Sequence, residues 1–170
     1  MPFARTRLLR DHRGVVAVEF ALVALPAFML VLGIIETGIL MLKESVMEGA
    51  TQSAARQVRT GVVQTSGDAV GRFTTEFCNN LYTFTCSDFH FDIRTFADFP
   101  QIALPDLTFD SAGNPSNTVF QPGGAGKVVT VRVVTRHNFM TPLIGSLMGG
   151  DGSSMVLTST AVMRTEPYDK

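Results

Sequence analysis

"RDHRGVVAVEFALVALPAFMLVLGIIETGILML", residues 10–42, is the stretch that decides the fold of this chain of 170 residues. Between residues 15 and 42 its only ionisable side chains are the carboxylates of Glu19 and Glu36. A helix rises about 1.5 Å per residue, so a run of about 28 residues extends about 42 Å. The hydrocarbon core of a bilayer is about 30 Å thick and needs about 20 residues. The run therefore predicts a transmembrane helix over residues 15–42.

Two other interpretations of this run are disfavoured. A cleaved secretory signal has an apolar region of about 7–15 residues, followed by small residues at its cleavage site. Ala21 and Ala24 imitate such a site, but the apolar run continues far beyond them. A buried core helix is disfavoured as well, because the remaining chain is too small to enclose it.

The charges beside the run predict its orientation. Lys43 and Glu44 cancel just after it, whereas the leader before it is basic. The positive-inside rule then keeps the N-terminus cytoplasmic and exports everything after Leu42. This leader is the only dense basic cluster and the formal net charge is −1, so a nucleic-acid groove is not expected. The basic residues of the leader are Arg5, Arg7, Arg10 and Arg13.

The two carboxylates of the run need an explanation. A charge at mid-membrane costs at least about 2.5–3.5 kcal/mol and by default marks a functional site. Glu19 lies about one turn into the run, where it can reach the interface and where the helix dipole favours an anion. A tolerated, dipole-compatible carboxylate is therefore one interpretation of Glu19. Glu36 lies near the far interface and is interpreted as an interfacial or snorkelling carboxylate.

The context of Glu19 supports a more specific interpretation. A basic leader, Gly14, an apolar segment and a glutamate at the fifth position after the glycine resemble the processing site of type IV prepilins and pseudopilins. "RG", "AVEFALV" and a run of membrane length together resemble the TadE family of tight-adherence (Flp-type) pilus pseudopilins. "TPLIG" and "AVMRTE" near the C-terminus are also similar to TadE-like proteins, whereas residues 66–126 are not covered by the resemblance.

The resemblance implies a processing step and a role for Glu19. A membrane-embedded prepilin peptidase would cut between Gly14 and Val15 on the cytoplasmic side, removing residues 1–14 as a leader. Glycine suits such a site because it has no Cβ to obstruct the protease. Glu19 would become the fifth mature residue and neutralise the terminal amine of a neighbouring subunit, since an unpaired desolvated carboxylate is penalised. A contact with Val15 of its own chain is also one turn away.

The resemblance further implies a minor pseudopilin of the bacterial inner membrane, with its C-terminal domain in the periplasm. It would support pilus biogenesis, secretion and surface adherence, and could enter the pilus after processing. Its partners would be the prepilin peptidase, other pilins or pseudopilins, and the inner-membrane assembly platform. It would be a substrate of a peptidase and not an enzyme, with no cofactor, metal or small-molecule substrate.

Helical periodicity continues after the membrane run. Apolar residues recur every four positions on one face, with polar residues on the other. Gly61 is typical of a C-terminal helix stop. One helix is therefore expected from Val15 to about Thr60, with residues 43–61 as an exported amphipathic extension. Its apolar face comprises Val46, Ala50, Ala54 and Val58.

Small residues on the same helix predict contacts with other helices. Two pairs are separated by four positions, a spacing that lets helices approach closely. They are Gly33 with Thr37, and Gly49 with Ser53. Ordinary helix composition is the alternative for either pair.

Residues 62–170 predict an exported α+β domain. A second helix is expected within residues 66–84, capped by Ser66 or Asp68. The Pro- and Gly-rich residues 97–126 predict a long loop. The predicted fold class is α+β, in which the long N-terminal helix packs on a small antiparallel sheet with one further helix. The apolar stripe of the second helix comprises Val70, Phe73, Phe77 and Leu81, and the strands are expected at residues 88–96, 127–139 and 153–166.

The two cysteines, Cys78 and Cys86, lie on the exported side of the predicted membrane helix. An oxidising compartment and an even number of cysteines favour a disulfide between them. The alternative is two small buried apolar residues.

A catalytic or metal site is weakly supported. His90, Asp92 and His137 could approach one another if their strands pair, but His90 and Asp92 are expected on a solvated strand face. The sequence contains no GxSxG, HExxH or P-loop pattern. Two rival functions stay open. One is a membrane-anchored exported domain with a binding role outside any filament, and the other is an exported enzyme.

Overall fold

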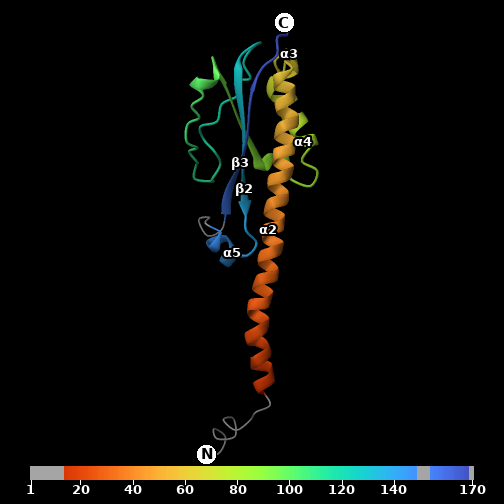
Figure 1. Cartoon of the computed structure of the whole chain (residues 1–170), viewed down its shortest axis with the longest axis vertical. Coiled ribbons are helices and arrows are strands. Elements are labelled where there is room, and N and C mark those ends of the chain that lie inside the picture. Colours follow the sequence, from red (N-terminus) through yellow and green to blue (C-terminus); the bar gives the residue numbers. More distant parts are fainter. Residues whose placement is uncertain (1–13, 149–153, 169–170) are drawn as a thin grey trace, which may run out of the picture.

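One long helix runs along the length of the molecule, and a small α+β domain packs on its C-terminal half (Figure 1). The structure is a computed structural model that describes residues 14–148 and 154–168. The long helix, α2, spans Val15–Arg59. The predicted leader, including its four arginines, lies outside the described residues except for Gly14. The predicted fold class is confirmed.

The end of α2 is set by a glycine, as predicted. Thr60 donates its N–H to the carbonyl of Arg56, and Gly61 follows in the left-handed conformation with φ 81°. A Cβ at Gly61 would collide with the ring of Tyr168, so the position requires glycine for both reasons. Arg56 and Arg59 in the last turn suit the negative end of the helix dipole.

Two short helices follow, α3 (Val62–Thr65) and α4 (Ala69–Asn79). Asp68 caps α4, because its Oδ1 accepts the N–H of Gly71 at 2.9 Å. Phe73, Phe77 and Leu81 are buried as the predicted stripe requires, whereas Val70 is 52% exposed. Burial therefore begins only after the first turn of α4.

Three antiparallel strands form one sheet in the order β1-β2-β3. They are β1 (Phe89–Phe96), β2 (Val128–Asn138) and β3 (Ser154–Arg164). The register places Phe91 opposite Val133, and Val133 opposite Ser159. Directly paired residues share a face, so the odd-numbered residues of all three strands face the same side.

That side carries the core of the domain. α2 packs against α4, β2 and β3, and the rings of α4 pack edge-to-face on β1. Phe77 lies with its ring centroid 5.0 Å from that of Phe91. The buried cluster includes Ala54, Val58, Phe73, Ile93, Val129, Val131, Val133 and Ala161.

The opposite face of β1 and β2 is covered by residues 97–126, which contain one 3₁₀ turn, η3 (Phe99–Gln101), and isolated β-bridges but no further helix or strand. Beyond covering that face, this loop returns beside the outer edge of β1. Ile93 donates its N–H to the carbonyl of Val119 at 2.7 Å and accepts the N–H of Gln121 at 2.8 Å. The loop therefore satisfies part of an edge that would otherwise be open.

The expectation that Asp92 lies on a solvated strand face was wrong. Asp92 is 0% exposed, because the loop of residues 97–126 covers this face of the sheet. His90, two residues earlier, is half-buried. Alternation along β1 predicted which residues share a face. It did not predict that the loop of residues 97–126 would cover the polar face.

A further short helix, α5 (Pro142–Leu147), connects β2 to the segment before β3. Figure 1 shows it at the end of the domain from which the uncovered half of α2 projects. A Cβ built on Gly33 of α2 would lie 3.4 Å from Cδ1 of Ile144 in α5. The contact between the domain and α2 therefore begins near Gly33.

Candidate functional site

The predicted cleavage site lies at the free end of α2. Gly14 is the N-cap residue and Val15 is the first residue of the helix. Both are exposed, and a Cβ at Gly14 would meet no other atom within 4 Å. The α+β domain therefore does not cover the peptide bond between them.

Glu19 lies one turn into α2, and its side chain is exposed. Its Cα is about 6 Å along the helix axis from that of Val15, from four residues at about 1.5 Å each. The carboxylate thus lies near the positive end of the helix dipole and close to where a new N-terminus at Val15 would lie.

The first half of α2 is apolar and uncovered. α2 is the one helix among the described residues that is long and apolar enough to cross a membrane, and its most apolar window is 0% buried. Phe20, Leu22 and Phe28 are each more than half exposed. Such a surface is compatible with single-pass membrane anchoring, because water would penalise it.

The surroundings of Glu36 differ from those that the sequence predicted. It is 1% exposed, and its carboxylate accepts the N–H of Met140 at 3.1 Å and that of Thr141 at 3.2 Å. His137 Nε2 lies 3.5 Å from Glu36 Oε1. Glu36 is therefore not an interfacial side chain reaching solvent. It joins α2 to the end of β2 and the start of α5.

Lys43, two turns further along α2, makes a second polar link to β2. Its Nζ donates to the carbonyl of Arg136 at 2.8 Å and lies 5.5 Å from the ring centroid of Phe89. Glu36 and Lys43 thus hold neighbouring residues of β2 through side chains of opposite charge. The only sequence signal for these links was a pair of charges interrupting an apolar face.

The two pairs of small residues on α2 lie on different sides of the helix. Gly33 and Gly49 are 16 positions apart, which rotates them by about 160° at 3.6 residues per turn. Gly33 faces α5, and the hydroxyl of Thr37 donates to the carbonyl of Gly33 at 2.8 Å. Gly49 is exposed with no atom near its Cβ position, and Ser53 is half-buried. Only the second pair leaves room for a helix from another chain.

Cys78 and Cys86 are joined by a disulfide, with their Cα atoms 5.5 Å apart. Cys78 belongs to the last turns of α4, and Cys86 begins a 3₁₀ turn, η2 (Cys86–Asp88), just before β1. The bond closes a connection of eight residues between α4 and the sheet.

Asp92 is the centre of a buried ionic cluster. Arg94 Nε donates to Asp92 Oδ1 at 3.0 Å, and Arg132 Nη2 donates to Oδ2 at 2.6 Å. The N–H of Val119 donates to Oδ1 at 3.0 Å. Burial by itself raises the pKa of Asp92, but hydrogen bonds from Arg94, Val119 and Arg132 outweigh it and hold that pKa below its ordinary value.

This cluster fixes the long loop to the sheet. Arg94 Nη2 donates to the carbonyl of Asn117 at 2.7 Å, and Arg132 Nη1 donates to that of Pro105 at 3.0 Å. Each arginine therefore bridges Asp92 and a loop carbonyl. Both carboxylate oxygens of Asp92 therefore accept hydrogen bonds from groups of the domain itself.

The structure does not bring His90, Asp92 and His137 together into one site, as the alternative prediction required. His90 pairs with Val134 in the sheet register, and His137 lies three residues further along β2. An odd number of residues in a strand reverses the face, so the two histidines point to opposite sides. No group of three metal-ligating side chains occurs within residues 14–148 and 154–168.

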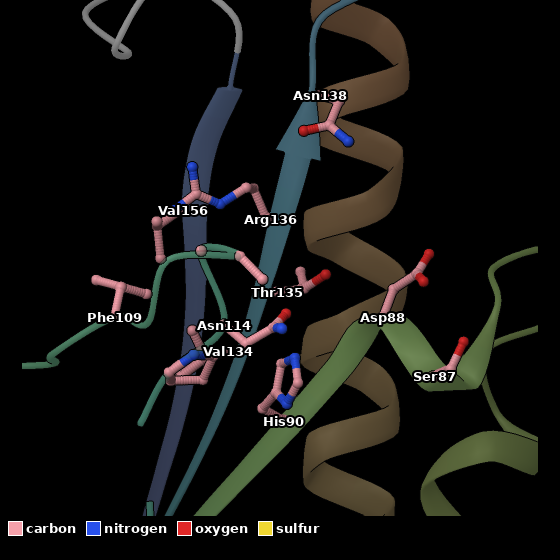
Figure 2. Close-up of a pocket in the computed structure, with 13 residues that line it drawn as sticks. Ser87, Asp88, His90, Phe109, Asn114, Val134, Thr135, Arg136, Asn138 and Val156 are labelled. Carbon is pink, nitrogen blue, oxygen red and sulfur yellow. The ribbon is translucent and has the colours of Figure 1, made fainter. Parts of the chain in front are cut away.

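His90 instead lines a polar cavity of about 250 Å³ between the sheet and residues 109–115 of the loop (Figure 2). The guanidinium of Arg136 lies 5.7 Å from the ring centroid of Phe109, and its Nη1 donates to Ser154 Oγ at 2.8 Å. These contacts hold the tip of the loop on β2 and β3.

Comparison with known proteins finds a family match, and it covers the segment that contains the predicted cleavage site. Residues 14–56 match the family model described as TadE-like protein. The match begins at the predicted cleavage glycine and ends three residues before α2 does. It confirms the resemblance to the TadE-like family over this segment. No curated protein and no solved structure matches the chain.

Proposed function

We propose, from the TadE-like match of residues 14–56 and the uncovered apolar helix, that this protein is a minor pseudopilin of a tight-adherence pilus system. It is inserted in the bacterial inner membrane with its N-terminus in the cytoplasm and its domain in the periplasm. A prepilin peptidase removes residues 1–14, and the mature chain then supports pilus biogenesis, secretion and adherence.

The observation that carries this proposal is the first turn of α2. Gly14 is exposed just before the helix, Val15 opens the helix, and Glu19 follows one turn later on an apolar surface. A protease needs access to the bond after Gly14, and a bundle of helices needs a partner for Glu19 in lipid. Both needs are met by one cut that creates an ammonium group at Val15.

In an assembled bundle the new ammonium of one subunit pairs with the Glu19 carboxylate of its neighbour. In low dielectric a carboxylate without a partner is strongly penalised, so the pair fixes the register between helices. Gly49 and Ser53, on the side of α2 that is open to other chains, then let a neighbouring helix approach closely.

The geometry also supports a shorter membrane segment than the predicted residues 15–42. The domain contacts α2 from Gly33 onward, and Glu36 and Leu40 are buried against it. We therefore assign about 20 residues from Val15 to the hydrocarbon core, the number that about 30 Å requires. The exported α+β domain presents the contacts to other pilins, pseudopilins and the assembly platform.

N-terminal sequencing of protein from cells with and without the peptidase tests the proposal. The mature form begins at Val15 when the peptidase is present, and the Gly14→Ala variant stays at full length. Gly38→Ala is the matched control, because Gly38 lies in the same helix with no atom within 4 Å of its Cβ position. A native form that keeps its arginine leader overturns the proposal.

A second candidate shares the anchor but not the cut. The uncovered helix is also compatible with a single-pass anchored domain that binds a partner outside any filament. That candidate predicts an unprocessed chain in every strain and no effect of Gly14→Ala, so the same experiment separates the two. We propose no catalytic activity.

A further inference from the structure

We propose that α5, together with the adjoining Met140, is a membrane-surface contact, so that the exported domain lies against the headgroup region of the bilayer. The occupant of this surface is the lipid interface next to α2. The inference rests on one premise of the proposed function, namely that the first half of α2 spans the membrane.

The first argument is the position of α5 along α2. If the hydrocarbon core of about 30 Å begins at Val15, at about 1.5 Å per residue it ends near Ile34. Ile144 of α5 meets α2 at Gly33, and Met140 and Thr141 meet it at Glu36. The segment therefore lies at the depth where the hydrocarbon gives way to headgroups.

The second argument is the chemistry of the segment. Residues 139–148 read "FMTPLIGSLM" and contain no ionisable side chain. Met140 is 70% exposed and Leu147 is 75% exposed. Large apolar side chains at the end of a domain, beside a helix that leaves it for the membrane, suit insertion into the headgroup and acyl boundary.

The third argument is that the segment is held in place. The Glu36 carboxylate accepts both N–H groups at the start of the segment, and it is itself buried. Phe139, the residue before Met140, is also buried, with its ring 5.1 Å from that of His137. Met140 therefore projects from a fixed base, and its exposure does not result from a loose strand end.

The experiment uses tryptophan as a depth probe, because the chain contains none. Leu147→Trp and Met140→Trp are made in the full chain and reconstituted in phosphatidylcholine vesicles whose acyl chains carry bromine near the headgroup or near the chain end. Phe28→Trp, in the uncovered helix, is the membrane control. Phe99→Trp is the solvent control, because Phe99 is exposed and follows the end of β1 that pairs with Val128, away from α5.

The expected result is quenching of Leu147→Trp and Met140→Trp by headgroup-proximal bromine that is at least about twofold stronger than for Phe99→Trp, with weaker quenching by chain-end bromine. Phe28→Trp shows the reverse order. If Leu147→Trp and Met140→Trp behave like Phe99→Trp while Phe28→Trp is quenched, the inference fails and the proposed anchor survives. If Phe28→Trp is also unquenched, both fail.

A second copy of the chain is the competing occupant. It would shield the tryptophans from lipid bromine and shift their emission in proportion to the protein density in the vesicles. That outcome overturns the membrane contact. Circular dichroism of each variant confirms that the fold is retained before the quenching is compared.

Discussion

The carboxylate of Glu36 on α2 lies 3.5 Å from Nε2 of His137 on β2, and both side chains are almost completely buried. The same carboxylate accepts the backbone N–H groups of Met140 and Thr141. One side chain of α2 therefore contacts His137 on β2 and two backbone N–H groups between β2 and α5. The sequence of the first half of α2 is one continuous apolar run. This contact explains why the helix nevertheless has an uncovered part before about Gly33 and a part packed on the domain after it.

Loss of the Glu36 carboxylate should loosen the base of the domain. Glu36→Ala leaves the N–H groups of Met140 and Thr141 buried without their acceptor and removes the carboxylate beside His137, so we expect a loss of about 1.5–3 kcal/mol of local stability. Hydrogen exchange of the amides of Met140 and Thr141 in micelles measures this change directly. Glu44→Ala, at an exposed position of the same helix, is the control. Unchanged exchange in Glu36→Ala would show that the domain holds α2 without this link.

Removing Asp92 should destabilise the whole α+β domain. Asp92→Ala leaves Arg132 buried without its counter-charge, which costs about 3–5 kcal/mol. Asp98→Ala breaks an exposed ion pair with Arg164 and should cost less than about 1 kcal/mol. Denaturant unfolding of the two variants in parallel measures the difference. Equal costs would mean that the buried cluster contributes no more than the surface pair.

Stability should also fall in acid through Asp92. Its folded pKa is lowered, so its contribution is fully present above the unfolded value. That contribution declines as the pH drops below about 3.9, the ordinary value of an aspartate, and is lost through the folded pKa. Unfolding free energy measured down the acid range should fall less steeply in Asp92→Asn than in the wild type. Parallel slopes would rule out Asp92 as the titrating group, and Asp98→Asn gives the slope of an exposed aspartate.

The disulfide between Cys78 and Cys86 should stabilise the connection from α4 to β1. A closed connection this short contributes about 2–3 kcal/mol by its effect on the unfolded chain. We expect the paired change Cys78→Ser and Cys86→Ser to lower the free energy of unfolding by that amount. Dithiothreitol should produce the same shift in the wild type and none in the variant. A wild-type protein extracted from the envelope that ignores the reductant would contain free thiols.

Glu19 should matter for assembly more than for processing. Glu19→Gln keeps the shape of the side chain but removes the charge that meets the ammonium of Val15, so subunits lose their register. We expect a normal mature N-terminus together with reduced pilus material in sheared surface fractions. Glu48→Gln, at an exposed position on the C-terminal half of α2, is the control. Normal pilus output would reduce Glu19 to a carboxylate tolerated at the interface.

Local pattern was sufficient for the long helix, for α4 and for the three strands of this fold. Apolar periodicity and Gly61 defined α2, Asp68 capped α4, and alternation separated the two faces of β1. These features depend on neighbours within about one helical turn or two strand positions, so a sequence displays them directly. The TadE-like signature around Gly14 and Glu19 is equally local.

By itself, then, the sequence determined a long apolar helix, a domain of one further helix and three strands after it, and the candidate cleavage site. Only the tertiary structure decided what the charges do. Asp92 became a buried counter-ion because a loop of residues 97–126 folds over its strand face, and Glu36 became a buried acceptor because α5 returns to α2. The physical reason is that a charge is stabilised by the partners that replace water, and here those partners come from segments far away in the chain.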